Sequence, residues 1–406
     1  MTNGDYFNLL SGQYYPYSDF RDDGIKCLKI DNISYGKIIW ENITFLPNTY
    51  LTLFKDLVLN EGDMVIALNR PITNGRLKIG LLKESDTPAL LYQRVGKFIS
   101  KNDKADKKFI FLLFNGAYFK DSILKSLVGS DQPYIRNSQL LKTQIPLPPL
   151  PEQRRIATIL SSVDAAIQET DTIIAQAEQL KQEMMQELFT GKKRLPGFFE
   201  EWSSKKMLDI GITYSGLTGK KKSDFLDGQY PYIPFLNVLK GPVIDTTMFD
   251  FVNIGSDESQ NRVRKGDLLF NGSSETPEEV GMCSVLLEDV HDLYLNSFCF
   301  GFRLSDEVAA SPLFLTYWFR SPYGRKALYP LAQGVTRYNI AKNSFMQLDI
   351  PYPSHDEQQA IAAILSTVDK KLEAERDHRA RLETVKRGLM QDLLTGRVRV
   401  EVNGHE

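Results

Sequence analysis

The sequence predicts an α+β protein with an internal repeat, in which two mixed α/β segments are separated by two long antiparallel helices that form a coiled coil. Three observations support this prediction. A helical segment recurs 205 positions further along the chain, both copies keep a heptad pattern, and the rest mixes short β-type runs with helical ones. The 406 residues suffice for two or three domains, and a hydrophobic content of 42% is ordinary for a folded protein.

The repeat is clearest between segments 145–191 and 350–396, which are identical at 20 of 47 positions. Weaker matches at the same offset continue upstream, such as Gly129 with Gly334. The helical copies are alike while the α/β segments have diverged, which indicates one shared scaffold role and two different roles. The predicted domains are an α/β segment (1–144), a helical region with its linker (145–197), a second α/β segment (198–349) and a second helical region (350–406).

The helices are predicted at about 152–190 and 357–395, because prolines disfavour a helix before each start and a glycine follows each end. Apolar residues at steps of three and four form a heptad seam with polar interruptions. The duplication predicts that the two helices pack on each other about a pseudo-twofold axis. The predicted interface residues are Ile156, Leu160, Val163, Ile167, Ile174 and Leu188 in the first helix and Ile361, Leu365, Val368, Leu372, Leu389 and Leu393 in the second.

Each α/β segment contains both β-type and helical patterns. The apolar and β-branched runs predict strands at 25–30, 63–69, 79–84, 266–272, 283–288 and 293–304. Longer apolar stretches predict helices at 109–127 and 313–332.

Several functional classes are disfavoured. No apolar run approaches the ~20 residues of a membrane helix, and the N-terminus has no signal-peptide pattern. The three cysteines are scattered and there are only four histidines, so we expect no disulfide framework and no metal site. These features predict a cytoplasmic protein that is not bound to a membrane.

Known catalytic motifs are also missing from the sequence. We find no GxGxxG after a strand, no GxxxxGK[ST], no HExxH, no GxSxG and no DPPY-like or NPPF-like tetrapeptide. The acidic residues form no nuclease-like spacing. We therefore predict that the chain is not an enzyme by itself and holds no cofactor.

Several loops mix basic, amide and aromatic residues, which contact phosphates and base edges in nucleic-acid complexes. Segment 1–144 carries a formal charge of +4 and segment 198–349 one of −4, so DNA binding must come from local patches. The candidate DNA-binding residues are Arg70, Asn74, Arg76, Lys78, Arg94, Arg136 and Asn137 in the first α/β segment and Lys220, Lys221, Lys222, Ser273, Ser274, Thr336, Arg337, Tyr338 and Asn339 in the second. The lysine triplet is expected to hold phosphate.

These segments together resemble the DNA specificity subunit of type I restriction–modification systems. The resemblance covers essentially the whole chain and is carried by IPLPPLPEQRRIATILSSVD, LFTGKKRLPGF and IPYPSHDEQQAIAAILSTVD. The second copy departs from the first, since SHDEQ replaces PLPEQ and TGRVRV lacks the LPGF.

The resemblance implies that each α/β segment is a target recognition domain that reads one half of a bipartite, asymmetric site on double-stranded DNA. It implies that the helices set the gap between the half-sites and dock two methyltransferase subunits, with restriction–translocase subunits in the full complex. Adenine methylation, restriction of foreign DNA, S-adenosylmethionine, ATP and magnesium would then belong to those partners.

An alternative is a protein-interaction scaffold without sequence-specific DNA reading. The heptad helices fit the scaffold equally well, whereas the basic and amide loops fit it less well. An independent nuclease or methyltransferase is disfavoured by the missing motifs.

Overall fold

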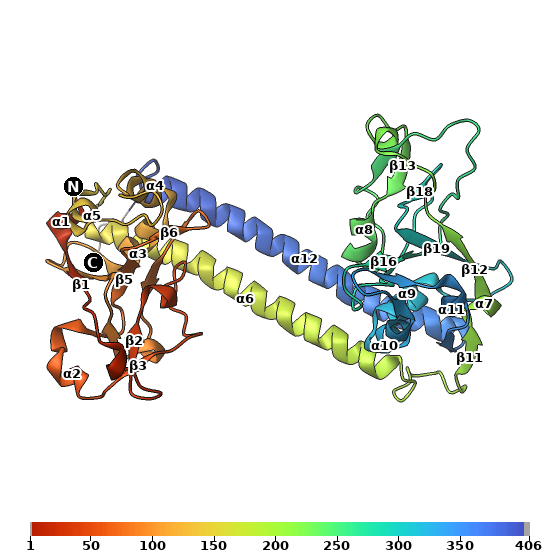
Figure 1. Ribbon diagram of the computed structural model, residues 1–406, viewed down its shortest axis with the longest axis horizontal. Coiled ribbons are helices and arrows are strands. Elements are labelled where there is room, and N and C mark those ends of the chain that lie inside the picture. Colours follow the sequence, from red (N-terminus) through yellow and green to blue (C-terminus); the bar gives the residue numbers. More distant parts are fainter. Residues whose placement is uncertain (1, 402–406) are drawn as a thin grey trace. The chain divides into compact units, whose positions relative to one another are not determined.

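The computed structural model describes residues 2–401, which divide into two compact units (Figure 1). Unit 1 comprises the chain up to Asp171 together with the chain from His378 onwards, and unit 2 is Thr172–Asp377. Each unit therefore joins one α/β segment to part of both long helices. Among residues 2–401, no helix has the length and apolar character needed to span a membrane.

Two four-stranded sheets build the α/β part of unit 1. The first is antiparallel, in the order β1 (Phe7–Ser11), β10 (Val95–Ser100), β5 (Met64–Ala67), β8 (Ile79–Leu81). The second runs β3 (Phe45–Leu46), β2 (Ile25–Leu28), β9 (Ala89–Leu91), β4 (Val58–Leu59), with β2 and β9 parallel. Shorter elements are α1 (Asn3–Tyr6), α2 (Tyr50–Leu53) and the hairpin of β6 (Ile72–Thr73) and β7 (Arg76–Leu77).

Strand β5 lies between two hydrophobic cores, which explains why all four of its residues are buried. Met64 and Ile66 join the core that also contains helices α3 (Lys107–Asn115), α4 (Ala117–Lys125) and α5 (Asn137–Lys142). Val65 and Ala67 join the core of the second sheet. Alternate side chains of a strand point to opposite faces, so one strand serves both cores.

Unit 2 repeats the arrangement of unit 1. Its main sheet has the order β12 (Gly211–Ser215), β19 (Cys299–Leu304), β15 (Leu268–Asn271), β17 (Cys283–Val285). Strands β19, β15 and β17 lie 204 positions after β10, β5 and β8, and α9 (Pro312–Arg320) lies 205 positions after α3. The register is also repeated, because Phe98 pairs with Met64 and Phe302 with Leu268. The duplication therefore extends through the diverged segments.

The other elements of unit 2 are short. The strands are β11 (Ser203–Lys206), β13 (Tyr230–Ile233), β14 (Asp250–Val252), β16 (Ser273–Ser274), β18 (Tyr294–Leu295), β20 (Ala332–Gln333), β21 (Tyr338–Ile340) and β22 (Asp349–Tyr352). The helices are α7 (Met207–Ile210), α8 (Phe235–Lys240), α10 (Pro322–Leu328) and α11 (Lys342–Met346).

The predicted strands are present, but three predicted elements are divided. Run 109–127 forms α3 and α4, which meet at Gly116 in an extended conformation. Run 313–332 is broken at Ser321, whose hydroxyl accepts a hydrogen bond from the Gly324 N–H, and Pro322 then starts α10. Run 293–304 forms β18 and β19, separated by a turn in which the Cys299 N–H bonds the Asn296 carbonyl.

The long helices are α6 (Leu150–Leu188) and α12 (His355–Leu394), and each begins two residues earlier than predicted. Pro151 is tolerated in the first turn of α6 because N–H groups there have no partner within the helix. At α12, the Ser354 hydroxyl accepts a hydrogen bond from the Glu357 N–H, at 3.4 Å, and so caps the helix.

All twelve predicted interface residues are buried or half-buried. Ile156 and Leu160 join the main core of unit 1 with Leu393. Ile361 and Leu365 join the main core of unit 2.

Ion pairs show that the helices are antiparallel. In unit 1, Asp164 pairs with Lys386, and Asp171, further along α6, pairs with Arg379, which is earlier in α12. In unit 2, Lys181 lies 2.5 Å from Asp369. Partner numbers fall along α12 as they rise along α6, as required for an antiparallel pair.

The repeated Glu-Gln pair at each helix start joins both helices to the α/β part. Glu152 at the start of α6 accepts two hydrogen bonds from Arg399, which follows the end of α12, at 2.8 and 2.6 Å. In unit 2, Glu357 accepts two from Arg194, which follows the end of α6, both at 2.8 Å. Each pair therefore ties the start of one helix to the segment after the other.

The neighbouring glutamine holds the first core helix of the same unit. Gln153 is fully buried, and its side-chain oxygen accepts a hydrogen bond from the N–H of Asp106, the N-cap of α3, at 2.8 Å. Gln358 does the same for Ser311, the N-cap of α9, also at 2.8 Å. The Glu-Gln match between the copies is thus a structural joint.

Candidate nucleic-acid interface

Three chain segments of unit 1 meet where β5 ends. The Leu68 N–H donates to the Arg94 carbonyl at 2.8 Å, and the Ile135 N–H donates to the Leu68 carbonyl at 2.9 Å. The Arg70 N–H donates to the Pro133 carbonyl at 2.7 Å. These backbone bonds bring together residues from three of the predicted loops. We call segments 68–78, 92–94 and 133–137 the unit 1 loop cluster.

The backbone of this cluster is unusual. Among the described residues, four non-glycine residues have positive φ, and three of them are Arg70 (45°), Asn74 (51°) and Arg94 (65°) in the cluster. Asn74 and Gly75 form the turn of the β6–β7 hairpin, where such angles are favoured. Positive φ is unfavourable for arginine, so the backbone of Arg70 and Arg94 is strained. Strained backbone is concentrated at functional sites. The fourth residue, Asp292, lies in unit 2 outside the predicted loops.

The arginines of the unit 1 loop cluster are available to a ligand. Arg70, Arg76, Arg94 and Arg136 are exposed, and no carboxylate among residues 2–401 forms an ion pair with any of them. The Arg76 guanidinium lies 4.7 Å from the centre of the Tyr35 ring, which orients it. Lys78 is half-buried. Free guanidinium groups can bind phosphate or the guanine edge.

Asn137 has a positioning role in the structure. Its side-chain amide donates to the Ser11 hydroxyl at 2.8 Å, which ties α5 to the end of β1. At the equivalent place in unit 2, the Lys342 ammonium donates to the Ser215 hydroxyl, also at 2.8 Å. Burial lowers the pKa of Lys342. The side-chain amide of Asn137, which was predicted to contact DNA, is therefore already engaged in a hydrogen bond within the protein.

The same convergence occurs in unit 2. The Ile340 N–H donates to the Gly272 carbonyl at 3.1 Å, and the Gly272 N–H donates to the Phe298 carbonyl at 2.8 Å. We call segments 272–282, 296–298 and 334–341 the unit 2 loop cluster. The Arg337 guanidinium lies 5.3 Å from the centre of the Phe298 ring, whose side chain is half-exposed. Of the predicted residues, Thr336, Arg337 and Asn339 are exposed and Tyr338 is half-buried.

Two predictions in unit 2 do not agree with the structure. Ser273 and Ser274 lie in β16, which pairs with β21 and leaves only 9% and 6% of these residues exposed. The Ser274 hydroxyl donates to the Glu279 carboxylate at 3.1 Å. Pairing with β21 therefore removes both serines from the surface that could contact DNA.

The three lysines of the predicted phosphate-binding triplet lie in different environments. The Lys220 side chain is 4% exposed, pairs with Glu258 and donates to the Asn253 carbonyl at 2.6 Å. Lys220 is thus a buried partner of Glu258, whose pKa it lowers, rather than a free phosphate ligand. Lys221 and Lys222 are exposed and stay candidates for phosphate contacts.

Sequence reasoning missed several aromatic residues beside the clusters. Phe298 occupies the place that Arg94 has in unit 1, 204 positions earlier, and this offset is the signal that could have found it. In unit 1, Tyr14 is exposed and its ring centre lies 6.4 Å from that of Tyr92. The run QYYPYSDF at 13–20 indicates this aromatic surface.

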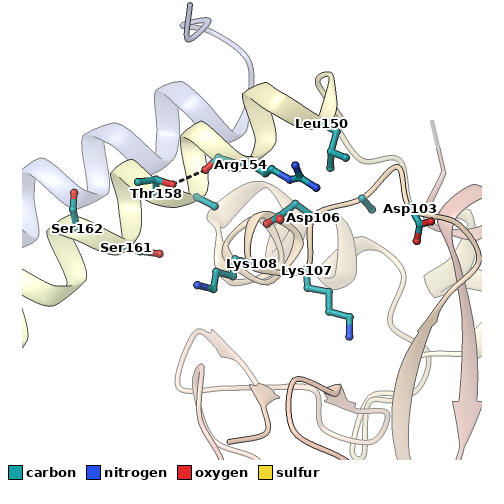
Figure 2. Close-up of a pocket in the computed structure, with 11 residues that line it drawn as sticks. Asp103, Asp106, Lys107, Lys108, Leu150, Arg154, Thr158, Ser161 and Ser162 are labelled. Carbon is teal, nitrogen blue, oxygen red and sulfur yellow. Dashed lines mark hydrogen bonds between the residues drawn. The ribbon is translucent and has the colours of Figure 1, made fainter. Parts of the chain in front are cut away.

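A separate groove of about 900 Å³ lies between the start of α3 and the start of α6 in unit 1 (Figure 2). Lys107 and Lys108 on α3 and Arg154 on α6 line it, and none of the predicted DNA-binding residues does. Arg94 directly precedes β10, whereas the groove residue Asp103 follows the other end of that strand. In unit 2 the equivalent positions carry Pro312, Leu313 and Gln359, so the basic lining is specific to unit 1.

Comparisons with known proteins agree with this arrangement. The family described as type I restriction modification DNA specificity domain matches residues 1–179 and 199–384. The MjaVIII specificity subunit of a type I restriction enzyme of Methanocaldococcus jannaschii is 50% identical over 188 residues, which are 46% of this chain and 44% of that protein. The match thus spans less than half of that relative.

Two further likenesses cover nearly the whole chain. The putative MjaX specificity subunit of the same organism is 25% identical over 394 residues, which are 93% of this chain and 88% of that protein. The crystal structure of the S subunit from M. genitalium has a TM-score of 0.58 at 15% identity and covers 97% of this chain and 95% of that one. This last likeness concerns the fold.

Proposed function

Because the chain belongs to the type I restriction–modification DNA specificity family, we propose that it is the DNA-reading subunit of such a complex and reads a bipartite, asymmetric site. The observation that carries this proposal is the pair of loop clusters. They occupy equivalent places in the two units, share their backbone connections and differ in their side chains. Two equivalent frames with different side chains suit two different half-sites.

The exposed groups give each cluster a way to read DNA. Contacts to phosphate fix the register of a protein on the duplex, and contacts to base edges carry the sequence information. Arg70, Arg94 and Arg136 can do either, since their guanidinium groups bind phosphate or guanine in bidentate fashion. In unit 2, the ring of Phe298 orients Arg337, and Asn339 suits adenine.

We infer that the chain performs no catalysis and holds no cofactor. In this proposal, two methyltransferase subunits supply S-adenosylmethionine and modify adenine, and restriction–translocase subunits use ATP and magnesium. The absence of catalytic motifs in the sequence supports this division. The complex would act on DNA in the cytoplasm.

The long helices are proposed to dock the partner subunits. Leu180 on α6 and Val385 on α12 each leave 51% of their surface exposed, and neither belongs to the predicted heptad seam. Exposed apolar side chains on a structural helix suit a protein partner. Exposed charged residues on both long helices, such as Arg155 on α6 and Arg381 on α12, can fix the register of such contacts.

The test is to express the chain with its cognate methyltransferase in a host and map modified adenines by long-read sequencing. The proposal predicts a split, asymmetric motif with a fixed gap. A contiguous palindrome would contradict the two-reader proposal. A stable complex that leaves adenine unmodified and binds no DNA would instead favour the protein-interaction scaffold.

A further inference from the structure

The two loop clusters can be compared position by position. Strands β5 and β15 lie 204 residues apart, and so do β8 and β17. The connecting segments 68–78 and 272–282 therefore have the same length and join equivalent strands. Each also bonds to an equivalent partner, since Leu68 accepts from Ile135 and Gly272 accepts from Ile340. Differences between the two segments are thus differences at matching places.

Charge is reversed between these matching segments. In unit 1 the segment carries Arg70, Arg76 and Lys78 and no acidic residue. In unit 2 it carries three glutamates and no basic residue, namely Glu275, Glu278 and Glu279. Glu275 and Glu278 are exposed and form no ion pair among the described residues.

The other two loops continue the contrast. Phe298 stands where unit 1 has Arg94, and Ala341 stands where unit 1 has Arg136. Arg337 is the only basic residue in the sequence of the unit 2 loop cluster. Over matching positions, the formal charge is +4 for segments 68–78, 92–94 and 129–137 and −1 for segments 272–282, 296–298 and 334–342.

This contrast has a direct consequence for DNA binding. Attraction of cationic side chains to phosphate releases counterions and makes affinity depend on salt, while uncharged contacts to bases do not. We propose that the unit 1 loop cluster is the phosphate anchor of the DNA complex and that unit 2 reads its half-site mainly through uncharged and aromatic groups. This inference rests on the proposed function and adds to it an unequal division of work between the units.

The side chains of unit 2 fit this role. The ring of Phe298 is half-exposed and offers an apolar face, while Tyr338 and Asn339 offer hydrogen-bonding groups at the surface. Carboxylates at Glu275 and Glu278 repel phosphate within the ~8–10 Å over which charges act at physiological salt. They therefore disfavour non-specific binding through unit 2, and that unit adds selectivity rather than general affinity.

The experiment measures affinity for the cognate duplex over a salt series, using the full chain assembled with its methyltransferase. The variant R70Q/R94Q/R136Q removes three exposed cations from unit 1. Each lost phosphate contact lowers the slope of log affinity against log salt by about 0.9, so the expected change is up to about 2.7. The matched variant in unit 2, K221Q/K222Q/R337Q, also removes three exposed cations and is expected to lower the slope by no more than about 0.9.

A second variant separates charge from folding. R70K/R94K/R136K keeps the charge at the same positions and is expected to keep most of the wild-type slope. An unchanged slope in R70Q/R94Q/R136Q, or an equal change in K221Q/K222Q/R337Q, would overturn the inference. If the unaltered complex shows no preference for any DNA sequence, the proposed function fails instead, so the two failures are distinguishable.

Discussion

Replacing Gln153 with alanine tests the structural joint in unit 1. Gln153 is fully buried and makes three hydrogen bonds, to the Asp106 N–H at 2.8 Å and to the carbonyls of Lys104 and Pro148 at 2.9 and 2.8 Å. At about 1 kcal/mol for each bond, the variant Q153A loses about 3 kcal/mol of unfolding free energy. For a body of about 200 residues, this lowers Tm by roughly 6–12 °C.

The assay is urea unfolding of the purified chain, combined with hydrogen–deuterium exchange read by mass spectrometry. Exchange should increase in α3 and at the start of α6, while unit 2 stays protected. The control is Q176A, on an exposed position of the same helix, which should change stability by less than about 0.5 kcal/mol. If Q153A behaves like Q176A, the assigned role of the joint is wrong.

Three further predictions concern the core, one loop and pH. The variant L365A, at a fully buried position of α12, should cost about 2–5 kcal/mol in chemical denaturation, and a smaller loss would show that the core of unit 2 does not depend on this helix. Gly334 has φ of +143°, and a Cβ there would lie 2.0 Å from the Arg337 carbonyl oxygen. The variant G334A should therefore shift the backbone of the unit 2 loop cluster and weaken DNA binding by the assembled complex in an anisotropy titration, and unchanged binding would show that this loop does not contact DNA. Hydrogen bonds from Arg399 hold the pKa of Glu152 below its ordinary value. The stability that this gives the folded protein is present above the pKa of Glu152 in the unfolded chain and is lost as the pH falls through its lower pKa in the folded protein. The loss of stability at acid pH should therefore be steeper in the wild type than in E152Q.

Much of the fold could be predicted because the chain contains its own internal comparison. The offset of 205 residues located both long helices to within two residues, and the heptad pattern identified their buried faces. Helix starts were less accurate because a proline in the first turn of α6 and the capping role of Ser354 extend the helices beyond a simple proline rule. Gly116 and Ser321 divide apolar runs that hydrophobicity alone reads as continuous.

The candidate interface was less predictable, because exposure depends on contacts between distant segments. Lys220 is buried by Glu258, which is 38 positions away, and Ser274 is covered by pairing with Tyr338. The loops themselves are brought together by backbone bonds such as that between Leu68 and Arg94. No local pattern contains this information.

The most direct test of the central claim is to exchange residues 198–349 for the corresponding segment of another family member and to map adenine methylation by the assembled complex. One half of the recognised sequence is expected to change, and the other half is expected to stay as before. A change in both halves, or in neither, would contradict the assignment of one reader to each unit.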